Sequence, residues 1–166
     1  MLRTRLFHLF GALLLLSGAC NLFESSEPDA IDDYPAWSPD GKTIAYARSR
    51  SDNPGLYLID VNGRNNRILL RGNWTTPSWS PDGQWLVLGN YSDAQIYKVK
   101  ANGDSLTQLT TGGRSFFPDW SVADRIVYDS DVNDPRGAKV LWTMDPVVFS
   151  GWLSKFFPVE RTVNSR

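Results

Sequence analysis

The sequence predicts an all-β chain made of about three repeats, each folding as a small four-stranded sheet. The pentapeptide Trp-Ser-Pro-Asp-Gly occurs twice, and Trp37, Trp79 and Trp120 follow one another at spacings of 42 and 41 residues. Apolar and polar residues roughly alternate in the short runs around these tryptophans, which is the period of a strand. The 166 residues include 13 Gly, 10 Pro and 7 Trp, a composition typical of short strands joined by tight turns.

Residues 1–20 are predicted to be an export signal rather than part of the fold. Two arginines precede an apolar run over residues 6–16, which is too short to span a membrane, and small residues then lead to Cys20. Cys20 is the single cysteine, so no internal disulfide can form. Its position resembles the lipobox of bacterial lipoproteins, which implies acylation of Cys20. Ser17 departs from the usual leucine of that pattern, and an ordinary secretory signal with an unmodified thiol is the alternative.

Residues 21–33 are predicted to be an acidic tether, because they carry five acidic residues, two consecutive serines and little to bury. Removal of the residues before Cys20 leaves 15 basic and 18 acidic residues. This balance argues against a nucleic-acid partner, since phosphate binding needs a clustered basic face. It also argues against a purely electrostatic contact with anionic lipid, so acyl chains are the expected membrane anchor.

The repeats are predicted to span residues 34–74, 75–115 and 116–146. Each contains about four short runs, and four strands in about 42 residues is the size of one propeller blade. The second halves align as well, placing Tyr57, Tyr97 and Trp142 in one repeated position. The sequence therefore predicts a partial β-propeller of about three four-stranded blades, preceded by the signal and the tether.

These repeats carry a family resemblance. The motif Trp-Ser-Pro-Asp-Gly, followed by a strand, a turn and "LYLIDVNG" or "IYKVKANG", resembles the WD40-like repeat of TolB-type β-propellers, which also occurs in the propeller domains of prolyl-oligopeptidase-like enzymes. The resemblance covers about residues 34–146. It implies cell-envelope protein partners, although TolB is a soluble periplasmic protein with a further N-terminal domain, so its specific partners are not carried over.

The repeated motif is predicted to be architectural. Proline presets φ, aspartate bonds nearby backbone amides and glycine accepts a positive φ, so the motif makes a tight reversal between two strands. A tryptophan at the end of the incoming strand can then fill the space between adjacent blades. The alternative is that the repeated aromatic residues present stacking faces to a ligand. The structural motif positions are Trp37, Pro39, Asp40, Gly41, Trp79, Pro81, Asp82, Gly83 and Trp120.

No catalytic residue, metal site or cofactor is predicted. Serine hydrolysis needs a proton-accepting histidine, and the only histidine, His8, lies in the signal. A zinc or transition-metal site normally needs histidine or cysteine. Asp129, Asp131 and Asn133 alternate as in an EF-hand loop, but Asp134 stands where glycine is required, so a solvated hairpin loop is expected.

The repeat pattern ends at residue 146, and residues 147–166 form a divergent tail. Apolar residues recur there at helical spacing, with Pro158 as a stop, so a short amphipathic helix is one interpretation. The interpretation that we favour is out-of-frame sequence with an accidental apolar stripe, because the departure is abrupt and follows an intact repeat. The residues of the predicted stripe are Phe149, Trp152, Leu153, Phe156 and Phe157.

The expected function is that of a non-catalytic, lipid-anchored and truncated propeller scaffold, which binds cell-envelope proteins outside the cytoplasm. Two other classes stay open: the propeller remnant of an exported prolyl-oligopeptidase-like hydrolase, and a carbohydrate-binding module. Because closed propellers have four to eight blades, a homodimer that completes a six-bladed ring is a further expectation.

Overall fold

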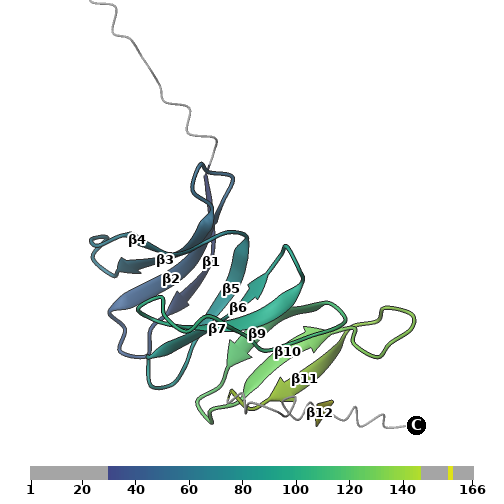
Figure 1. Cartoon of the computed structure of the whole chain (residues 1–166). Coiled ribbons are helices and arrows are strands. Elements are labelled where there is room, and N and C mark those ends of the chain that lie inside the picture. The colour runs from purple at the N-terminus through teal and green to yellow at the C-terminus, as the bar shows by residue number, and fades with distance from the viewer. Residues whose placement is uncertain (1–29, 147–156, 159–166) are drawn as a thin grey trace, which may run out of the picture.

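The computed structural model describes residues 30–146 and 157–158, and within these ranges the chain consists of β-strands joined by turns and loops. The strands form three antiparallel sheets of four strands each, arranged as neighbouring blades (Figure 1). This confirms the predicted all-β class and the partial propeller. The predicted signal, Cys20 and most of the tether lie outside the described residues. No helix in the described ranges is long and apolar enough to cross a membrane.

Blades one and two follow the chain in simple order. Each is a meander in which every strand pairs with its sequence neighbour. Blade one consists of β1 (Ile31–Trp37), β2 (Thr43–Ser49), β3 (Gly55–Asp60) and β4 (Arg67–Arg71). Blade two consists of β5 (Trp74–Trp79), β6 (Trp85–Asn90), β7 (Gln95–Lys100) and β8 (Thr107–Gln108).

Blade three takes its fourth strand from the divergent tail. Its strands are β9 (Ser115–Trp120), β10 (Ile126–Ser130), β11 (Val140–Met144) and β12 (Phe157–Pro158). Phe157 pairs with Thr143 and Pro158 with Trp142. The helical interpretation is therefore wrong at Phe157, because the free edge of β11 offers backbone partners, and proline is tolerated on an edge strand. The other residues of the predicted stripe lie outside the described residues.

The predicted repeat boundaries need two corrections. The tether does not extend to residue 33, because Ile31, Asp32 and Asp33 pair with Ser49, Arg48 and Ala47 in the ladder of blade one. The blades also begin just outside the predicted repeat limits, since Trp74 opens blade two rather than closing repeat one. Charge at Asp32 and Asp33 pointed to a tether, whereas an edge position and the ion pair between Asp32 and Arg48 accommodate both residues in a strand.

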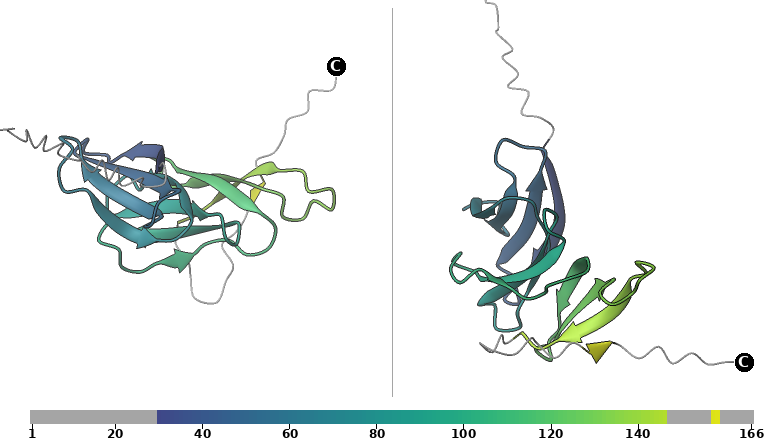
Figure 2. Two further views of the ribbon diagram at one scale, coloured as in Figure 1. Left: turned by 90° about the horizontal axis from the view of Figure 1, so that it is seen from above. Right: turned by 45° about the vertical axis from the view of Figure 1, so that its right-hand side comes forward.

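The inner strands β1, β5 and β9 are neighbours and hold the blades together, while the later strands fan outward (Figures 1 and 2). The hydrophobic core is divided between the two blade interfaces. The cluster between blades one and two comprises Ala45, Leu56, Leu58, Trp79, Leu86, Leu88 and Val99. The cluster between blades two and three comprises Val87, Ile96, Leu109, Trp120, Ile126, Tyr128, Trp142 and Met144.

Candidate interaction surface

The first two motif turns share one hydrogen-bond pattern. In blade one the Ser38 hydroxyl donates to Asp40 (2.7 Å) and accepts from the Thr43 amide (2.9 Å), while Asp40 accepts from the Lys42 amide (3.1 Å). Gly41 closes the turn at a φ of 67° and donates its amide to the Ser38 carbonyl (2.9 Å). These bonds occupy the carboxylate of Asp40 with the turn itself.

The second turn repeats these contacts. The Ser80 hydroxyl donates to Asp82 (2.6 Å), and Asp82 accepts from the Gln84 amide (2.9 Å). Gly83 has a φ of 69°. The hydrogen bond from Ser80 is the main reason that the pKa of Asp82 is lowered, and the corresponding bond from Ser38 lowers the pKa of Asp40. Both aspartates are therefore ionised at neutral pH and poorly suited to donating a proton.

The third turn closes differently. It is one residue shorter than the other two, and Asp124 takes the left-handed conformation (φ 56°) at its closing position. The Asp124 carboxylate accepts the indole N–H of Trp120 (2.9 Å). In blade two, by contrast, the indole N–H of Trp79 reaches across to the carbonyl of Ala36 in blade one (3.1 Å).

The three motif tryptophans have different environments. Trp79 and Trp120 are each only 8% exposed and belong to the two blade interfaces, whereas Trp37 is 58% exposed. The expectation that Trp37 fills a gap between blades is wrong for the described residues. Trp79 and Trp120 each pack against the preceding blade, whereas the described residues contain no blade before blade one to cover Trp37.

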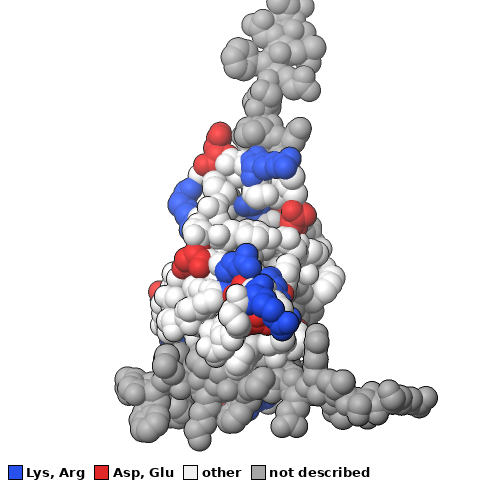
Figure 3. Space-filling view, turned by 90° about the vertical axis from the view of Figure 1, so that its right-hand side faces the viewer, with Lys and Arg blue, Asp and Glu red and all other residues white. Residues whose placement is uncertain are grey.

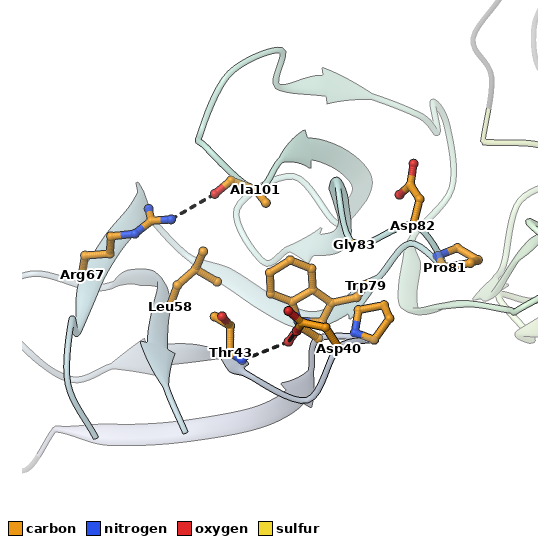
Figure 4. A pocket seen from close by; sticks show the side chains of 11 residues that line it. Asp40, Thr43, Leu58, Arg67, Trp79, Pro81, Asp82, Gly83 and Ala101 are labelled. Atoms are coloured by element: carbon orange, nitrogen blue, oxygen red, sulfur yellow. Dashed lines mark hydrogen bonds between the residues drawn. The ribbon is translucent and has the colours of Figure 1, made fainter. Parts of the chain in front are cut away.

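A groove of about 520 Å³ lies between the turns of blades one and two. Its lining includes Pro39, Pro81, Asp40 and Asp82, with Trp79 among them (Figure 4). At its other end the Arg67 guanidinium donates to the Ala101 carbonyl (3.1 Å). Since both carboxylates are held by their own turns, the groove offers no free acid and base pair for catalysis.

The other aromatic residues at the repeated position of the sequence make packing contacts within the fold. Tyr57 stacks on Tyr46 (5.5 Å between centroids), Tyr97 meets Trp74 edge to face (5.3 Å), and Trp142 lies in the core. None of the three forms an open stacking face.

The aspartates of the calcium-like loop are paired with cationic side chains of the chain. Asp131 accepts from the backbone amide and the guanidinium of Arg114, and the amide is the larger cause of its lowered pKa. Asp129 pairs with Lys139 (3.2 Å). No group of three or more metal-ligating side chains occurs in the part of the chain that the structure describes.

Each inner strand carries the same backbone irregularity. The residue before the proline of Pro-x-Trp is Tyr34, Thr76 or Phe117, and its φ is 56°, 45° or 53°. The strand ladder shifts register at each site. A positive φ is rare for bulky or β-branched residues, and a residue before proline normally prefers an extended backbone. These repeated bulges therefore hold strained residues on the inner strands.

Two of these residues belong to a group of aromatic side chains, of which three are exposed and Phe116 is half-buried. We name this group the aromatic surface: Tyr34, Tyr91, Phe116 and Phe117. The hydroxyls of Tyr34 and Tyr91 are hydrogen-bonded (3.2 Å), and Phe116 lies 5.9 Å from Tyr91 and 6.2 Å from Phe117 between centroids. Tyr91 and Phe117 are each 53% exposed. Sequence analysis missed this surface, although the residue before each proline was visible as a repeated position.

The aromatic surface adjoins a hollow and a cation. A cavity of about 360 Å³ is lined by Tyr34, Phe117 and neighbouring prolines of the inner strands. The Lys139 ammonium lies 4.4 Å from the centroid of Phe116, within the range of a cation–π contact. On the face shown in Figure 3, acidic and basic side chains are interspersed among uncharged residues. The aromatic surface itself combines exposed aromatic rings with the Lys139 ammonium, and aromatic residues are enriched in protein interfaces.

Comparison with known proteins agrees with this architecture. The family model described as the TolB beta propeller domain matches residues 23–143. An uncharacterized protein of Agrobacterium fabrum is 32% identical over 117 residues, which cover 63% of this chain and 39% of that protein. The Tol-Pal system protein TolB of Desulfosudis oleivorans is 32% identical over 85 residues, covering 49% of this chain and 19% of that protein.

A solved structure shows the same similarity in three dimensions. The TolB candidate from Agrobacterium tumefaciens superposes with a TM-score of 0.62 at 26% identity, covering 70% of this chain and 46% of that one. The chain thus spans less than half the length of each of these three relatives. Because the family model matches most of the sequence and the blades have the corresponding form, the chain belongs to the TolB beta propeller domain family.

Proposed function

We propose that this chain is a non-catalytic β-propeller scaffold of the cell envelope that binds protein partners through its aromatic surface. The observation that carries the proposal is the grouping of Tyr34, Tyr91, Phe116 and Phe117 from three blades at one exposed place. Contiguous exposed apolar groups on a soluble domain usually mark an interaction site. Large aromatic side chains also supply much of the binding energy at protein interfaces.

A protein partner fits this surface better than a nucleic acid does. The aromatic surface includes one nearby ammonium group, on Lys139, and that group already pairs with Asp129. A phosphate backbone would require several clustered cations. The name of one relative, the Tol-Pal system protein TolB, supports a partner within an envelope assembly.

The proposed role requires no catalysis. Residues 21–166 contain no histidine and no further cysteine, and the carboxylates of Asp40 and Asp82 are committed to their turns. The exported hydrolase remnant remains the alternative from the enzyme class.

We further propose that acylation at Cys20 anchors the chain to a bacterial membrane on its extracytoplasmic side. Support comes from the apolar run and small residues before Cys20 and from the acidic segment after it. Cells that express the chain should incorporate labelled palmitate, and globomycin should cause the unprocessed form to accumulate. The matched variant Cys20→Ser should take up no label, and absence of label in the unmodified chain would contradict the anchor.

The scaffold role can be tested by site-specific photo-crosslinking in the cell envelope. A crosslinking amino acid at Phe117 should give discrete adducts with protein, which Tyr34→Ser or Tyr91→Ser should weaken. The control position is Val122, which is 96% exposed in the turn at the other end of β9. Equal adducts at Phe117 and Val122, or none at Phe117, would refute the proposal. Adducts with glycan in place of protein would favour the carbohydrate-binding alternative.

The partners that we propose include a second copy of the chain. The exposed ring of Trp37 supports this, since the corresponding tryptophans of the next two blades are covered. The homodimer is independent of the lipid anchor.

A further inference from the structure

The two blade interfaces in this chain use one repeated set of positions. In blade two, Trp79 lies opposite Leu86, and Leu86 lies opposite Val99; all three pack on blade one. In blade three the same positions are Trp120, Ile126 and Met144, which pack on blade two. Each interface therefore places a tryptophan and two aliphatic residues of one blade against its predecessor.

Blade one carries the same positions without a covering blade among the described residues. Trp37 lies opposite Ile44, and Ile44 lies opposite Ile59. Tyr46 and Tyr57 continue this row. We name Trp37, Ile44 and Ile59 the open face of blade one, because Tyr46 is buried and the Arg48 guanidinium lies over the rings of Tyr46 and Tyr57. Trp37 is 58% exposed, and both isoleucines are partly exposed, although their counterparts in blades two and three are fully buried.

Blade three presents the complementary half of such an interface. The positions that receive the next blade's tryptophan include Ala45 and Leu56 in blade one and Val87 and Ile96 in blade two. By strand register, their counterparts in blade three are Val127 and Leu141.

Val127, Leu141 and Thr143 form what we name the outer face of blade three. Leu141 is 55% exposed. Ion pairs between Arg125 and Asp145 (2.9 Å) and between Asp129 and Lys139 (3.2 Å) border these residues. An apolar centre with a polar border is the usual composition of a protein interface.

We propose that the outer face of blade three in one copy docks on the open face of blade one in a second copy. The observation behind this choice of partner is that one chain carries both halves of an interface that it already forms twice internally. Such a contact joins two different surfaces, so it either closes into a ring or continues as a chain of copies. Two copies of the three described blades fall within the four to eight blades of closed propellers. The inference deepens the proposed scaffold role and rests on it for the identity of one partner.

Sedimentation equilibrium of the full chain in density-matched detergent tests this pairing. The mass should rise with concentration to that of two copies. Trp37→Lys and Leu141→Asp change opposite halves of the interface, and each should weaken association by at least about tenfold. Val122→Lys is the control on an exposed turn and should have no effect. Circular dichroism should show unchanged folding, because the replaced side chains are exposed.

An equimolar mixture of the Trp37→Lys and Leu141→Asp variants is the decisive sample. Each copy keeps one intact half, so the mixture should associate more tightly than either variant alone. A monomer at all concentrations overturns the inference. The inference is also overturned if Trp37→Lys abolishes association while Leu141→Asp leaves it intact. That result would mean that the open faces of blade one from two copies meet each other. Species larger than dimers that both variants reduce support the docking without ring closure.

These results are separable from the scaffold role. A monomer whose crosslinks at Phe117 persist would remove this inference alone. A dimer without any crosslink at Phe117 would remove the proposed partner-binding surface and keep the pairing.

Discussion

Replacement of the motif tryptophan should lower the free energy of unfolding by very different amounts in successive blades. Trp79 is 8% exposed and Trp37 is 58% exposed, so about half of the ring surface distinguishes the two sites. For a buried aromatic area of roughly 250 Å², this half corresponds to about 125 Å², or ~3 kcal/mol at ~25 cal/mol per Å². We therefore expect Trp79→Ala to lower the free energy of unfolding by ~3 kcal/mol more than Trp37→Ala does.

Urea unfolding followed by circular dichroism measures both variants, at concentrations where the chain is monomeric. The denaturant dependence should stay the same while the midpoint shifts, so that the difference reports stability. Trp120→Ala is a second buried case and should resemble Trp79→Ala, because Trp120 is also 8% exposed. Equal losses for Trp37 and Trp79 would refute the argument that each ring stabilises the chain through the preceding blade.

Three further predictions concern turns and titration. The hydrogen bond from the turn serine lowers the pKa of Asp82, so the stability that this carboxylate contributes is present above about pH 3.8 and is lost as the pH falls. Asp82→Asn should therefore weaken the decrease in the urea midpoint at acid pH. An unchanged decrease would contradict this. Gly113→Ala should destabilise the chain more than Gly41→Ala: both glycines have a positive φ, but only at Gly113 would the new Cβ lie 2.7 Å from the backbone of another segment. Thermal melting should show a loss of ~1–2 kcal/mol in the free energy of unfolding for Gly41→Ala and a larger loss for Gly113→Ala. Similar losses for the two variants would refute the clash. The hydrogen bond to Asp93 raises the pKa of Tyr97 to about 12, so the stability that this bond contributes is complete below pH 10 and is lost as the pH rises towards 12. Asp93→Asn should lower the pKa of Tyr97, which tyrosinate absorbance measures. An unchanged pKa would contradict the role of Asp93.

The fold was predictable because its information is local and repeated. The spacing of Trp37, Trp79 and Trp120, together with strand-period alternation, is sufficient to predict three blades. The exposure of Trp37 was not predictable in the same way, since identical pentapeptides surround Trp37 and Trp79. Their difference depends on what lies before each blade, which the motif does not encode.

The last strand and the aromatic surface escaped prediction for two other reasons. Phe157 lies beyond a break in the repeat, where the local spacing of apolar residues indicates a helix. The local sequence does not show that β11 has a free edge with which Phe157 can pair. The aromatic surface depends on Tyr34 and Phe117 adopting positive φ, which local preferences oppose. Tyr91 and Phe116 then approach them only through the arrangement of the blades.

The bulges of the inner strands place three side chains on a backbone conformation that is costly for any residue other than glycine. Glycine would adopt the left-handed backbone at Tyr34, Thr76 and Phe117 without penalty, whereas the residues present cost ~1–3 kcal/mol each. Aromatic rings stand at two of the three sites in spite of this backbone cost, which is expected of residues placed for contact rather than for stability.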